Sequence, residues 1–416
     1  MFAGKRAALG FIFVTVMLDM LAFGIIVPVL PRLITDFVHG DIALASKYLG
    51  LFVTTWALMQ FFFSPIIGML SDRFGRRPVV LLSNFGLGLD YVVMALAPTL
   101  GWLFLGRVLS GITSSTMPTA AAYVSDVTPP ENRARAFGVF GAAFGVGFIL
   151  GPALGGWLGS VNPRLPFWVA GGFSLLNGLY GLIVLPESLA VERRQAEFHW
   201  KDANPLGALD LLRSHRELFG LAIVNFLGYL AHEVYVTVFV LYATMRYAWD
   251  AKAIGTALAV VGVSSVVTSA LLVGPIVKRL GERLTLFSGL LLGATGFFLY
   301  GWAPAGWIFL GAIGINSLWS LAGPSSQALM TQRVSPSEQG ELQGALGSLR
   351  GIAMVIGPGM FSGLFAFFIS PERLLPGAPW FLAALLLLAA LAVAISVVPK
   401  AQSPGDNPLP VAEMAD

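Results

Sequence analysis

The chain contains no cysteine, few histidines and few charges. Of its 416 residues, 4 are histidine, and only 11% are Asp, Glu, Lys or Arg, whereas about a quarter is usual in soluble domains. The absence of cysteine excludes disulfides and thiolate metal sites, and four scattered histidines offer little for a metal centre or a catalytic nucleophile and its base. The sequence also lacks the G-x-x-x-x-G-K-[ST] loop that holds nucleotide phosphates, which argues against an ATP-driven pump. We therefore expect no enzyme, no bound metal and no organic cofactor.

Hydrophobic residues, in contrast, make up 56% of the chain, and the mean hydropathy is +0.79. So few charges cannot coat a soluble protein of this size, so the expected surroundings are lipid. A helix needs about 20 mostly apolar residues to cross a bilayer. The first apolar run is too long for a signal peptide and is interpreted as a retained helix. Twelve transmembrane helices are predicted, near residues 8–31, 47–70, 78–97, 101–125, 136–158, 166–186, 218–244, 252–277, 284–303, 306–331, 341–369 and 378–398.

The longest polar stretch separates six predicted helices from six. It divides the sequence into an N-terminal bundle (1–186), a cytoplasmic linker (187–217), a C-terminal bundle (218–400) and a cytoplasmic tail (401–416). If the N-terminus lies inside the cell, roughly two thirds of the 25 basic residues fall in cytoplasmic segments, in agreement with the positive-inside rule. Both termini are therefore expected in the cytoplasm. The basic residues are spread over separate segments, so no nucleic-acid partner is expected.

Three segments recur at a constant spacing of 206 residues. GMLSDRFGRRPVVL from Gly68 matches GPIVKRLGERLTLF from Gly274, Pro118 matches Pro324, and GVFGAAFGVGFILGP from Gly138 matches GALGSLRGIAMVIGP. An even number of helices separates the copies, so both halves face the same way in the membrane. Two parallel six-helix bundles related by an axis along the membrane normal are the architecture of rocker-type transporters, whose substrate site lies between the halves.

Several of these segments resemble a known family. GxLSDRxGRR between the second and third helices is similar to the signature loop of the major facilitator superfamily, and GVGFILGPALGG in the fifth helix resembles its antiporter motif. PVLPRL, ALMQFFFSPIIGMLSDRFGRRPV, GRVLSGITSSTMPTAAAYVSDVTPPENRARAFG and LQGALGSL resemble the tetracycline/proton antiporter branch. The resemblance covers nearly the whole chain. It implies an all-α membrane protein with twelve transmembrane helices in two pseudo-symmetric parallel bundles.

The same resemblance implies a proton-coupled antiporter that exports hydrophobic or amphipathic small molecules, tetracycline-like drugs among the candidates, by alternating access. Its partners would be a small-molecule substrate, protons and the lipid bilayer. The proton gradient would supply the energy, and a monomer is expected. The implied location is the cytoplasmic membrane, which is the inner membrane of a Gram-negative cell. The alternative is a proton-coupled importer of a nutrient or other organic solute, and the fifth-helix motif favours export.

A charged turn interrupts the apolar sequence between the second and third helices. Gly75 suits the tight turn. In the family, the aspartate of this turn lies between the halves, and the arginines pair with acids at the cytoplasmic end of the fourth helix, where this chain has Asp126. The resemblance therefore implies a gate that latches the halves in the outward-open state, and the alternative is a topology signal with a tight turn. The residues assigned to this gate are Gly68, Asp72, Arg73, Gly75, Arg76, Arg77 and Asp126.

Charged residues within the predicted spans are costly and are functional candidates by default. Asp19 and Asp90 lie roughly 16–18 Å into their helices at 1.5 Å per residue, close to the membrane midplane. A buried carboxyl group that faces the two sides in turn can carry a proton, as proton-coupled antiport requires. By resemblance, Asp90 lies in the transport path and Arg107 tunes proton transfer. Proton coupling is assigned to Asp19, Asp90, Arg107 and Glu233.

Two of these assignments leave alternatives open. Asp19 belongs either to the transport path or to a structural pair. Glu233 has no counterpart in the tetracycline exporters, and it is either a separate proton site or the salt-bridge partner of an arginine such as Arg350. His232 points about 100° away from Glu233 and is expected to be structural.

Polar stripes on the second, fourth and tenth helices complete the predicted cavity. The alternative role of such stripes is hydrogen bonding between helices. Substrate binding is assigned to Gln60, Ser114, Asn316, Gln327 and Arg350. The fifth helix is rich in small residues, which allow close helix approach in lipid. Its Gly147, Gly151, Pro152 and Gly155 are expected to form a seam between the halves.

Two positions depart from the tetracycline exporters. Gly293 replaces an aspartate of the ninth helix, and Ser265 replaces a histidine that is common in the eighth. Those exporters carry the drug as a cationic metal chelate, so the loss of both groups argues against metal–tetracycline as the cargo. Glu233 supplies a negative charge elsewhere and would suit another cationic or amphipathic compound.

Overall fold

The computed structural model describes residues 2–114, 116–194, 204, 206–207, 209–214, 216–335 and 337–398. Residues 195–203 of the predicted linker and the predicted tail 401–416 lie outside the described residues. The structure is 86% helical, with no strand among the described residues. The prediction of an all-α protein is therefore confirmed.

The N-terminal bundle contains α1 (Phe2–Ile26), α2 (Leu30–Phe37), α3 (Ile42–Phe74), α4 (Arg76–Leu96), α5 (Leu100–Thr113), α6 (Thr116–Val127), α7 (Arg133–Val161) and α8 (Leu165–Val184). Two of its predicted helices are each divided. The first breaks after α1 because Pro28 has no backbone N–H for the helix ladder, and α2 restarts with Pro31 in its first turn, where proline is tolerated.

The C-terminal bundle contains α9 (Leu209–Ser214), α10 (Arg216–Thr237), α11 (Phe239–Tyr247), α12 (Ala251–Val267), α13 (Val273–Trp302), α14 (Gly306–Ser317), α15 (Ala322–Thr331), α16 (Gln339–Phe368) and α17 (Ala378–Val397). A π-helical turn at Thr268–Leu272 joins α12 to α13, and a 3-10 turn at Leu318–Leu321 joins α14 to α15.

Ten segments of the described chain are long and apolar enough to cross a membrane. One of them, 251–302, contains two predicted spans, which a sharp turn at Gly281 separates. The pair α5 and α6 supplies the remaining span, which agrees with the predicted total of twelve. Gly281 has a φ of +73°, and Gly75, 206 residues earlier, has a φ of +106°. The repeat in the sequence therefore corresponds to a repeated left-handed turn that glycine adopts without strain.

A second backbone feature recurs at the same spacing. Pro118 has no N–H to donate to the carbonyl of Ser114, and the fourth span is interrupted there, between α5 and α6. Pro324 stands in the same relation to Ser320, which lies in the 3-10 turn of the tenth span. In both bundles, one proline thus removes a backbone hydrogen bond from the helix near the middle of a span.

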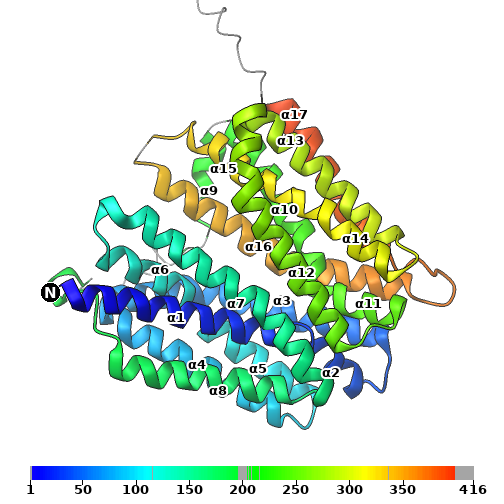
Figure 1. Ribbon diagram of the computed structural model, residues 1–416, viewed down its shortest axis with the longest axis horizontal. Coiled ribbons are helices and arrows are strands. Elements are labelled where there is room, and N and C mark those ends of the chain that lie inside the picture. Colours follow the sequence, from blue (N-terminus) through cyan, green and yellow to red (C-terminus); the bar gives the residue numbers. More distant parts are fainter. Residues whose placement is uncertain are drawn as a thin grey trace, which may run out of the picture.

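The two bundles diverge at one end and meet at the other (Figure 1). In Figure 1 they separate on the left, near the N-terminus, and meet on the right, near α2 and α11. We call these the open end and the closed end. The turn at Gly75 lies at the open end, and the loop 38–41 lies at the closed end.

One seam between the bundles runs along α7 and α12. A Cβ atom placed on Gly255 of α12 would lie 2.9 Å from Cα of Gly156 on α7, so the two backbones touch there. Gly262 approaches Ile149 within the same seam. Closer to the open end, a Cβ on Gly141 of α7 would meet no atom within 4 Å. The α7–α12 seam is therefore packed at the closed end and open at the other.

The second seam, between α3 and α16, follows the same gradient. Near the closed end, the Ser46 hydroxyl donates to the carbonyl of Ser362 at 3.0 Å. Further along, a Cβ on Gly351 would lie 2.5 Å from the ring of Phe61. One turn beyond, Gly347 faces open space. The open end is thus the mouth of a cleft that narrows along both seams.

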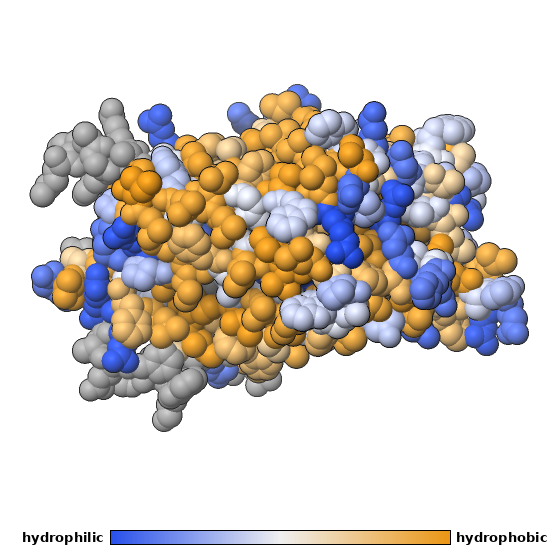
Figure 2. Space-filling model, turned by 90° about the horizontal axis from the view of Figure 1, so that it is seen from below, coloured by the Kyte–Doolittle hydropathy of each residue, from blue (hydrophilic) through white to orange (hydrophobic). Residues whose placement is uncertain are grey.

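The outside of the molecule carries a broad apolar surface. Figure 2 shows hydrophobic residues over the middle of one face, with hydrophilic residues concentrated toward both ends. Large apolar side chains lie exposed there and elsewhere, with Ile183 86% and Leu82 67% accessible. So much exposed apolar area fits a lipid-facing belt, and the charged ends fit the two aqueous sides.

Candidate functional site

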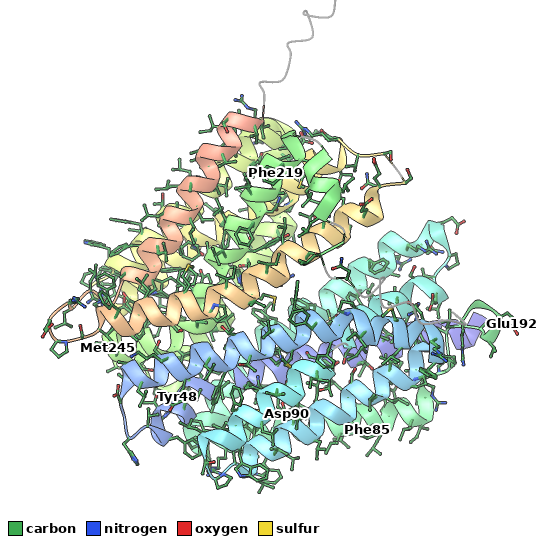
Figure 3. All side chains as sticks on the ribbon, turned by 180° about the vertical axis from the view of Figure 1, so that it is seen from behind. Tyr48, Phe85, Asp90, Glu192, Phe219 and Met245 are labelled. Carbon is green, nitrogen blue, oxygen red and sulfur yellow. The ribbon has the colours of Figure 1, made fainter. Side chains whose placement is uncertain are left out.

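The N-terminal bundle contains a buried ion pair. Nη2 of Arg107 on α5 lies 3.3 Å from Oδ2 of Asp90 on α4, and both side chains are buried. The same guanidinium also approaches the Met94 sulfur at 3.1 Å. Figure 3 shows Asp90 within the N-terminal bundle. Sequence reasoning named both charges but did not pair them, although unlike charges inside a membrane usually find each other.

Asp19 lies in the same bundle, on α1, and is also buried. Its Oδ1 accepts a bond from the amide of Asn177 on α8 at 3.4 Å, and Asn177 in turn accepts a bond from the hydroxyl of Thr15. Thr116, at the start of α6, lies beside the carboxyl group. Asp19 therefore occupies an uncharged polar cluster next to the break in the fourth span, with no basic partner among the described residues.

The break in the fourth span is completed by a side chain from α3. Nε2 of Gln60 donates to the carbonyl of Ser114 at 3.1 Å, which is the acceptor that Pro118 leaves unused. The structure thus brings the two predicted binding residues Gln60 and Ser114 together. In this conformation the Gln60 amide joins α3 to the α5–α6 junction.

Glu233 and Arg350 belong to the C-terminal bundle and differ sharply from the Asp90–Arg107 pair. Glu233 on α10 is buried, and its stem packs on Gly357 of α16, where a Cβ would lie 2.6 Å from Cγ of Glu233. Arg350 on α16 is exposed and lies near Glu233 and His232. The structure does not contain the alternative salt bridge, since no ion pair within 4 Å joins Glu233 to Arg350.

His232 lines the cleft beside Arg350. Its side chain is exposed although the rings of Tyr235 and Trp319 lie 5.7 and 5.9 Å from its own. A side chain that is accessible while large rings surround it faces an internal space rather than lipid. His232, expected to be only structural, therefore belongs to the wall of the cleft.

The other predicted binding residues of this bundle have different surroundings. The Asn316 amide donates to the carbonyl of Gly293 at 3.2 Å and accepts a bond from the Tyr235 hydroxyl, so it is engaged within the bundle. Gln327 on α15 is exposed and donates to Gln343 of α16 at 3.4 Å. Gln327 thus lies near the mouth of the cleft, whereas Asn316 lies in the core.

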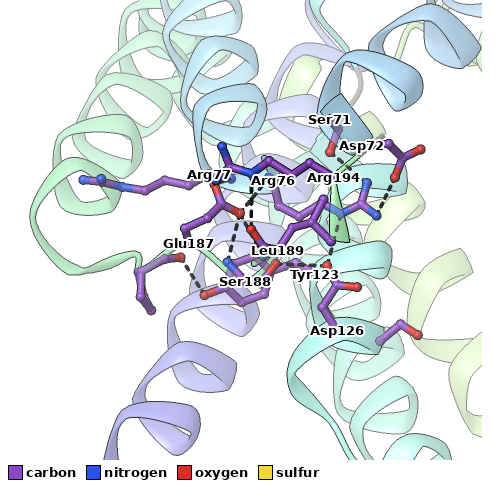
Figure 4. Close-up of polar contacts among 12 residues, drawn as sticks. Ser71, Asp72, Arg76, Arg77, Tyr123, Asp126, Glu187, Ser188, Leu189 and Arg194 are labelled. Carbon is purple, nitrogen blue, oxygen red and sulfur yellow. Dashed lines mark hydrogen bonds and ion pairs between the residues drawn. The ribbon is translucent and has the colours of Figure 1, made fainter. Parts of the chain in front are cut away.

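The charged turn between α3 and α4 forms a network at the open end (Figure 4). The guanidinium of Arg76 lies 2.6 Å from Asp72 and 3.1 Å from Asp126 of α6, so it joins the two acids. Arg77 donates to the carbonyl of Leu182 at 2.7 Å. Arg73 lies over the ring of its neighbour Phe74, and Gly68 faces open space.

All these partners belong to the N-terminal bundle. The predicted contact between Arg76 and Asp126 is present, but among the described residues no ion pair connects this network to the other bundle. In the conformation described here the turn therefore holds its own bundle together, and its described ion pairs do not join the two halves.

Glu187 is a member of this network that sequence reasoning missed. Its carboxylate accepts bonds from the backbone N–H groups of Arg76 at 2.9 Å and Arg77 at 3.3 Å, and so caps the first turn of α4. The signal was the cap position of α4: Gly75 has no side chain to satisfy the orphan N–H groups, so an external acceptor was required. Ser188 extends the network, since its hydroxyl donates to Asp126 at 3.1 Å.

The small residues of α7 lie on two faces. Gly147, Gly151 and Gly155 pack against the backbone of α1 in the same bundle, with Cα of Gly151 directly over Gly24. The adjacent face, with Pro152 and Gly156, contacts α12 of the other bundle. The seam between the halves is therefore one residue away from the predicted glycines, which are used to join α7 to α1.

Comparison with known proteins identifies the family to which this chain belongs. Residues 12–358 and 221–413 match the model of the Major Facilitator Superfamily. The tetracycline resistance protein of class C from Escherichia coli is 37% identical, over 91% of this chain and 93% of its own length. The class E protein from Escherichia coli is 37% identical, over 85% and 86%.

A solved structure, that of the human organic anion transporter MFSD10 (TETRAN), has the same fold, with a TM-score of 0.69 and 24% identity over 94% of this chain and 99% of its own. The resemblance inferred from the sequence motifs is confirmed, and with it a multi-pass membrane protein that is not an enzyme. The chain is a member of the Major Facilitator Superfamily related to the tetracycline resistance proteins.

Proposed function

We propose that this protein is a proton-coupled antiporter that exports hydrophobic or amphipathic small molecules by alternating access. It acts in the cytoplasmic membrane as a monomer, since one chain supplies both bundles and the cleft between them. Both termini lie in the cytoplasm, so the open end faces the cytoplasm and admits the cargo from there. The proton gradient supplies the energy.

The observation that carries this proposal is the change in packing along the two seams between the bundles. Both are packed at the closed end, where Ser46 bonds to Ser362, and both are open at the other, where Gly141 and Gly347 meet nothing. Small residues on both sides of the α7–α12 seam allow the backbones to separate and rejoin. Alternating access requires a cleft that opens to one side at a time.

Glu233 is the best-placed group for coupling in the C-terminal bundle. Its carboxyl group has no hydrogen-bond or ion-pair partner among the described residues, so a proton and a cationic group of the cargo would compete for it directly. Asp90 is held by Arg107, and proton transfer there would require that pair to separate. Asp19, with Asn177 as its partner, lies beside the interrupted fourth span, where a small rearrangement would change its access.

The gating role of the α3–α4 turn concerns the outward-open state. When the bundles close at the cytoplasmic end, the turn approaches the C-terminal bundle, and Arg76 exchanges part of its contact with Asp72 and Asp126 for new partners. The exchange would link the position of the bundles to the ion pairs of this turn.

Metal–tetracycline is disfavoured as the cargo by the packing around Gly293. A Cβ on Gly293 would lie 2.8 Å from Cβ of Trp319 and 2.9 Å from Leu387, so no acidic side chain fits at this position. Within the described spans of this bundle, Glu233 is then the acid near the midplane that a cationic chelate could meet, and the nearby Arg350 carries the opposite charge to the one required.

The test is proton movement in inverted membrane vesicles, followed with a pH-sensitive dye. Tetracycline with Mg²⁺ is added first, followed by a panel of cationic, zwitterionic and neutral drugs. Export predicts proton release on addition of a transported drug, and loss of that release in Glu233→Gln. Release with tetracycline would show that Gly293 and Ser265 are tolerated. Proton uptake together with solute would instead indicate the importer.

A further inference from the structure

Arg350 differs from the other arginine within the predicted spans in having no partner. Arg107 pairs with Asp90 at 3.3 Å in the interior of its bundle. Arg350 is exposed, and within the part of the chain that the structure describes it forms no ion pair and no hydrogen bond. It lies 11 residues into α16, about 17 Å from the start of that helix at 1.5 Å per residue. A guanidinium at this depth requires a partner or a water-filled cleft.

The surroundings of Arg350 indicate that it faces the cleft. Arg350 precedes Gly357 by seven residues, so the two share one face of α16, and Gly357 packs on Glu233 of α10. Gly347, one turn closer to the open end, faces open space. Arg350 lies near Tyr229 and His232 of α10 as well as near Glu233. The cation thus stands on the cleft wall formed by α10 and α16.

The described residues provide no anion for this site. Asp90 is engaged by Arg107 in the other bundle, and the Glu233 carboxylate is not within ion-pair distance of Arg350. Guanidinium groups bind carboxylates through paired, charge-assisted hydrogen bonds, which are strong in a desolvated cleft. We propose that Arg350 binds an anionic group, a carboxylate in the first instance, of the transported molecule. This inference rests on the proposed transport function and specifies its substrate class.

The geometry of the wall refines that class. Gly357, on which the stem of Glu233 packs, lies two helical turns from Arg350 toward the closed end, so the wall places an acid about 10 Å along α16 from the backbone of the cation. A molecule with an anionic group at one end and a cationic or polar group at the other matches both. The preferred cargo is therefore an amphipathic zwitterion, which distinguishes this cleft from one built for a cationic chelate.

Rhodamine B and its ethyl ester provide a matched pair of probes, because the carboxylate that is free in rhodamine B is an ethyl ester in the second dye. Binding of each dye to the purified protein in lipid nanodiscs is measured by fluorescence anisotropy. The variants are Arg350→Gln, Arg350→Lys and, as a control with the same loss of charge outside the membrane spans, Arg373→Gln. We expect Arg350→Gln to weaken rhodamine B binding about tenfold and ester binding less than twofold. Arg350→Lys should fall between, and Arg373→Gln should leave both dyes unaffected.

Four outcomes would overturn the assignment: equal weakening of both dyes by Arg350→Gln, no weakening of either dye, a wild-type protein that binds the ester better than rhodamine B, or a wild-type protein that binds neither dye. Proton release in inverted vesicles is measured in parallel with neutral and cationic drugs. Release that persists in Arg350→Gln while rhodamine B binding is unchanged refutes the anion site and leaves the antiporter intact. The absence of release with every drug in the wild type refutes the antiporter itself.

Discussion

The two bundles share one backbone plan but have different interiors. The N-terminal bundle buries the Asp90–Arg107 pair and the Asp19–Asn177 contact. The C-terminal bundle is built around Trp380, whose ring lies within 6.5 Å of six other aromatic rings, those of Tyr235, Phe239, Tyr242, Phe297, Tyr300 and Phe309. Its own charges within the predicted spans are held differently: Glu233 is buried without an ion-pair partner among the described residues, and Arg350 is exposed on the cleft wall.

The two bundles thus hold their arginines differently: Arg107 is fixed in a buried ion pair, whereas Arg350 is available in the cleft. Removing one member of a buried ion pair leaves an uncompensated charge and is strongly destabilising. Arg350, exposed on the cleft wall without a partner among the described residues, has little folding energy to lose and remains free for substrate. Variants at four positions test this contrast, and their expected effects on the free energy of unfolding decrease from Arg107 to Glu233.

The largest effect is expected for Arg107→Gln, which leaves Asp90 without its partner inside the N-terminal bundle. We expect a loss of about 3–5 kcal/mol. Equilibrium unfolding in mixed detergent micelles measures the loss. Arg350→Gln removes the same charge from the cleft wall and should cost less than about 1 kcal/mol. The double variant Asp90→Asn/Arg107→Gln should recover most of the loss, because no charge remains buried alone. If Arg107→Gln and Arg350→Gln lowered the free energy of unfolding equally, the contrast between the buried and the exposed arginine would be contradicted.

The next effect is expected for Gly293→Ala, which tests the density of the aromatic interior. The new methyl group would lie 2.8 Å from Cβ of Trp319, so the tightly packed core must shift, at a cost of about 1–3 kcal/mol. Gly311 of α14 faces open space, and Gly311→Ala should be neutral or slightly stabilising. The two variants are compared by unfolding as above. A neutral Gly293→Ala would show that the core yields at this position, and it would remove the packing argument against an acid there.

Much of the fold could be predicted from the sequence because lipid imposes strict rules on it. Apolar runs of about 20 residues locate the spans, and the 206-residue repeat relates the halves. The interruptions within the spans were harder to predict. Pro118 and Pro324 were visible as a repeated pair, but the interruption next to Ser114 appears only when the unused carbonyl finds Gln60 of α3. A single sequence does not show which distant side chain will donate a hydrogen bond to a carbonyl that a proline leaves without its helical partner.

The site was predicted as a set of residue types rather than as contacts. Asp90 and Arg107 are 17 positions apart on different helices, and only helix packing reveals that they pair. The glycines of α7 were recognised as a packing surface, yet two adjacent faces of one helix both carry small residues, and composition does not decide which face meets which neighbour. Glu187 was overlooked because it lies beyond the last predicted span of its bundle, although its partners are the N–H groups of α4.

A smaller effect is expected at the open end, where the two repeated turns differ. Glu187→Ala removes the acceptor for the first N–H groups of α4 and should cost about 1 kcal/mol, as the loss of a helix cap does. Glu282 follows Gly281 in the second turn and forms no ion pair among the described residues, so Glu282→Ala should change stability by less than about 0.5 kcal/mol. Hydrogen exchange in the first turn of α4 provides a local measurement, and unchanged protection in Glu187→Ala would rule out the cap.

The smallest effect on stability is expected for Glu233→Gln, which nevertheless should have the greatest consequence for transport. The carboxyl group has no partner among the described residues, and glutamine keeps its shape, so unfolding should shift by no more than about 0.5 kcal/mol. Glutamine cannot exchange a proton at this position. If Glu233 couples transport to protons, drug-induced proton release in inverted vesicles should disappear, while drug binding to the purified protein persists. Glu372→Gln, at an exposed site in the loop after α16, is the matched control and should behave as the wild type. Persistence of proton release in Glu233→Gln would transfer the coupling to Asp19 and Asp90, and thus to the N-terminal bundle.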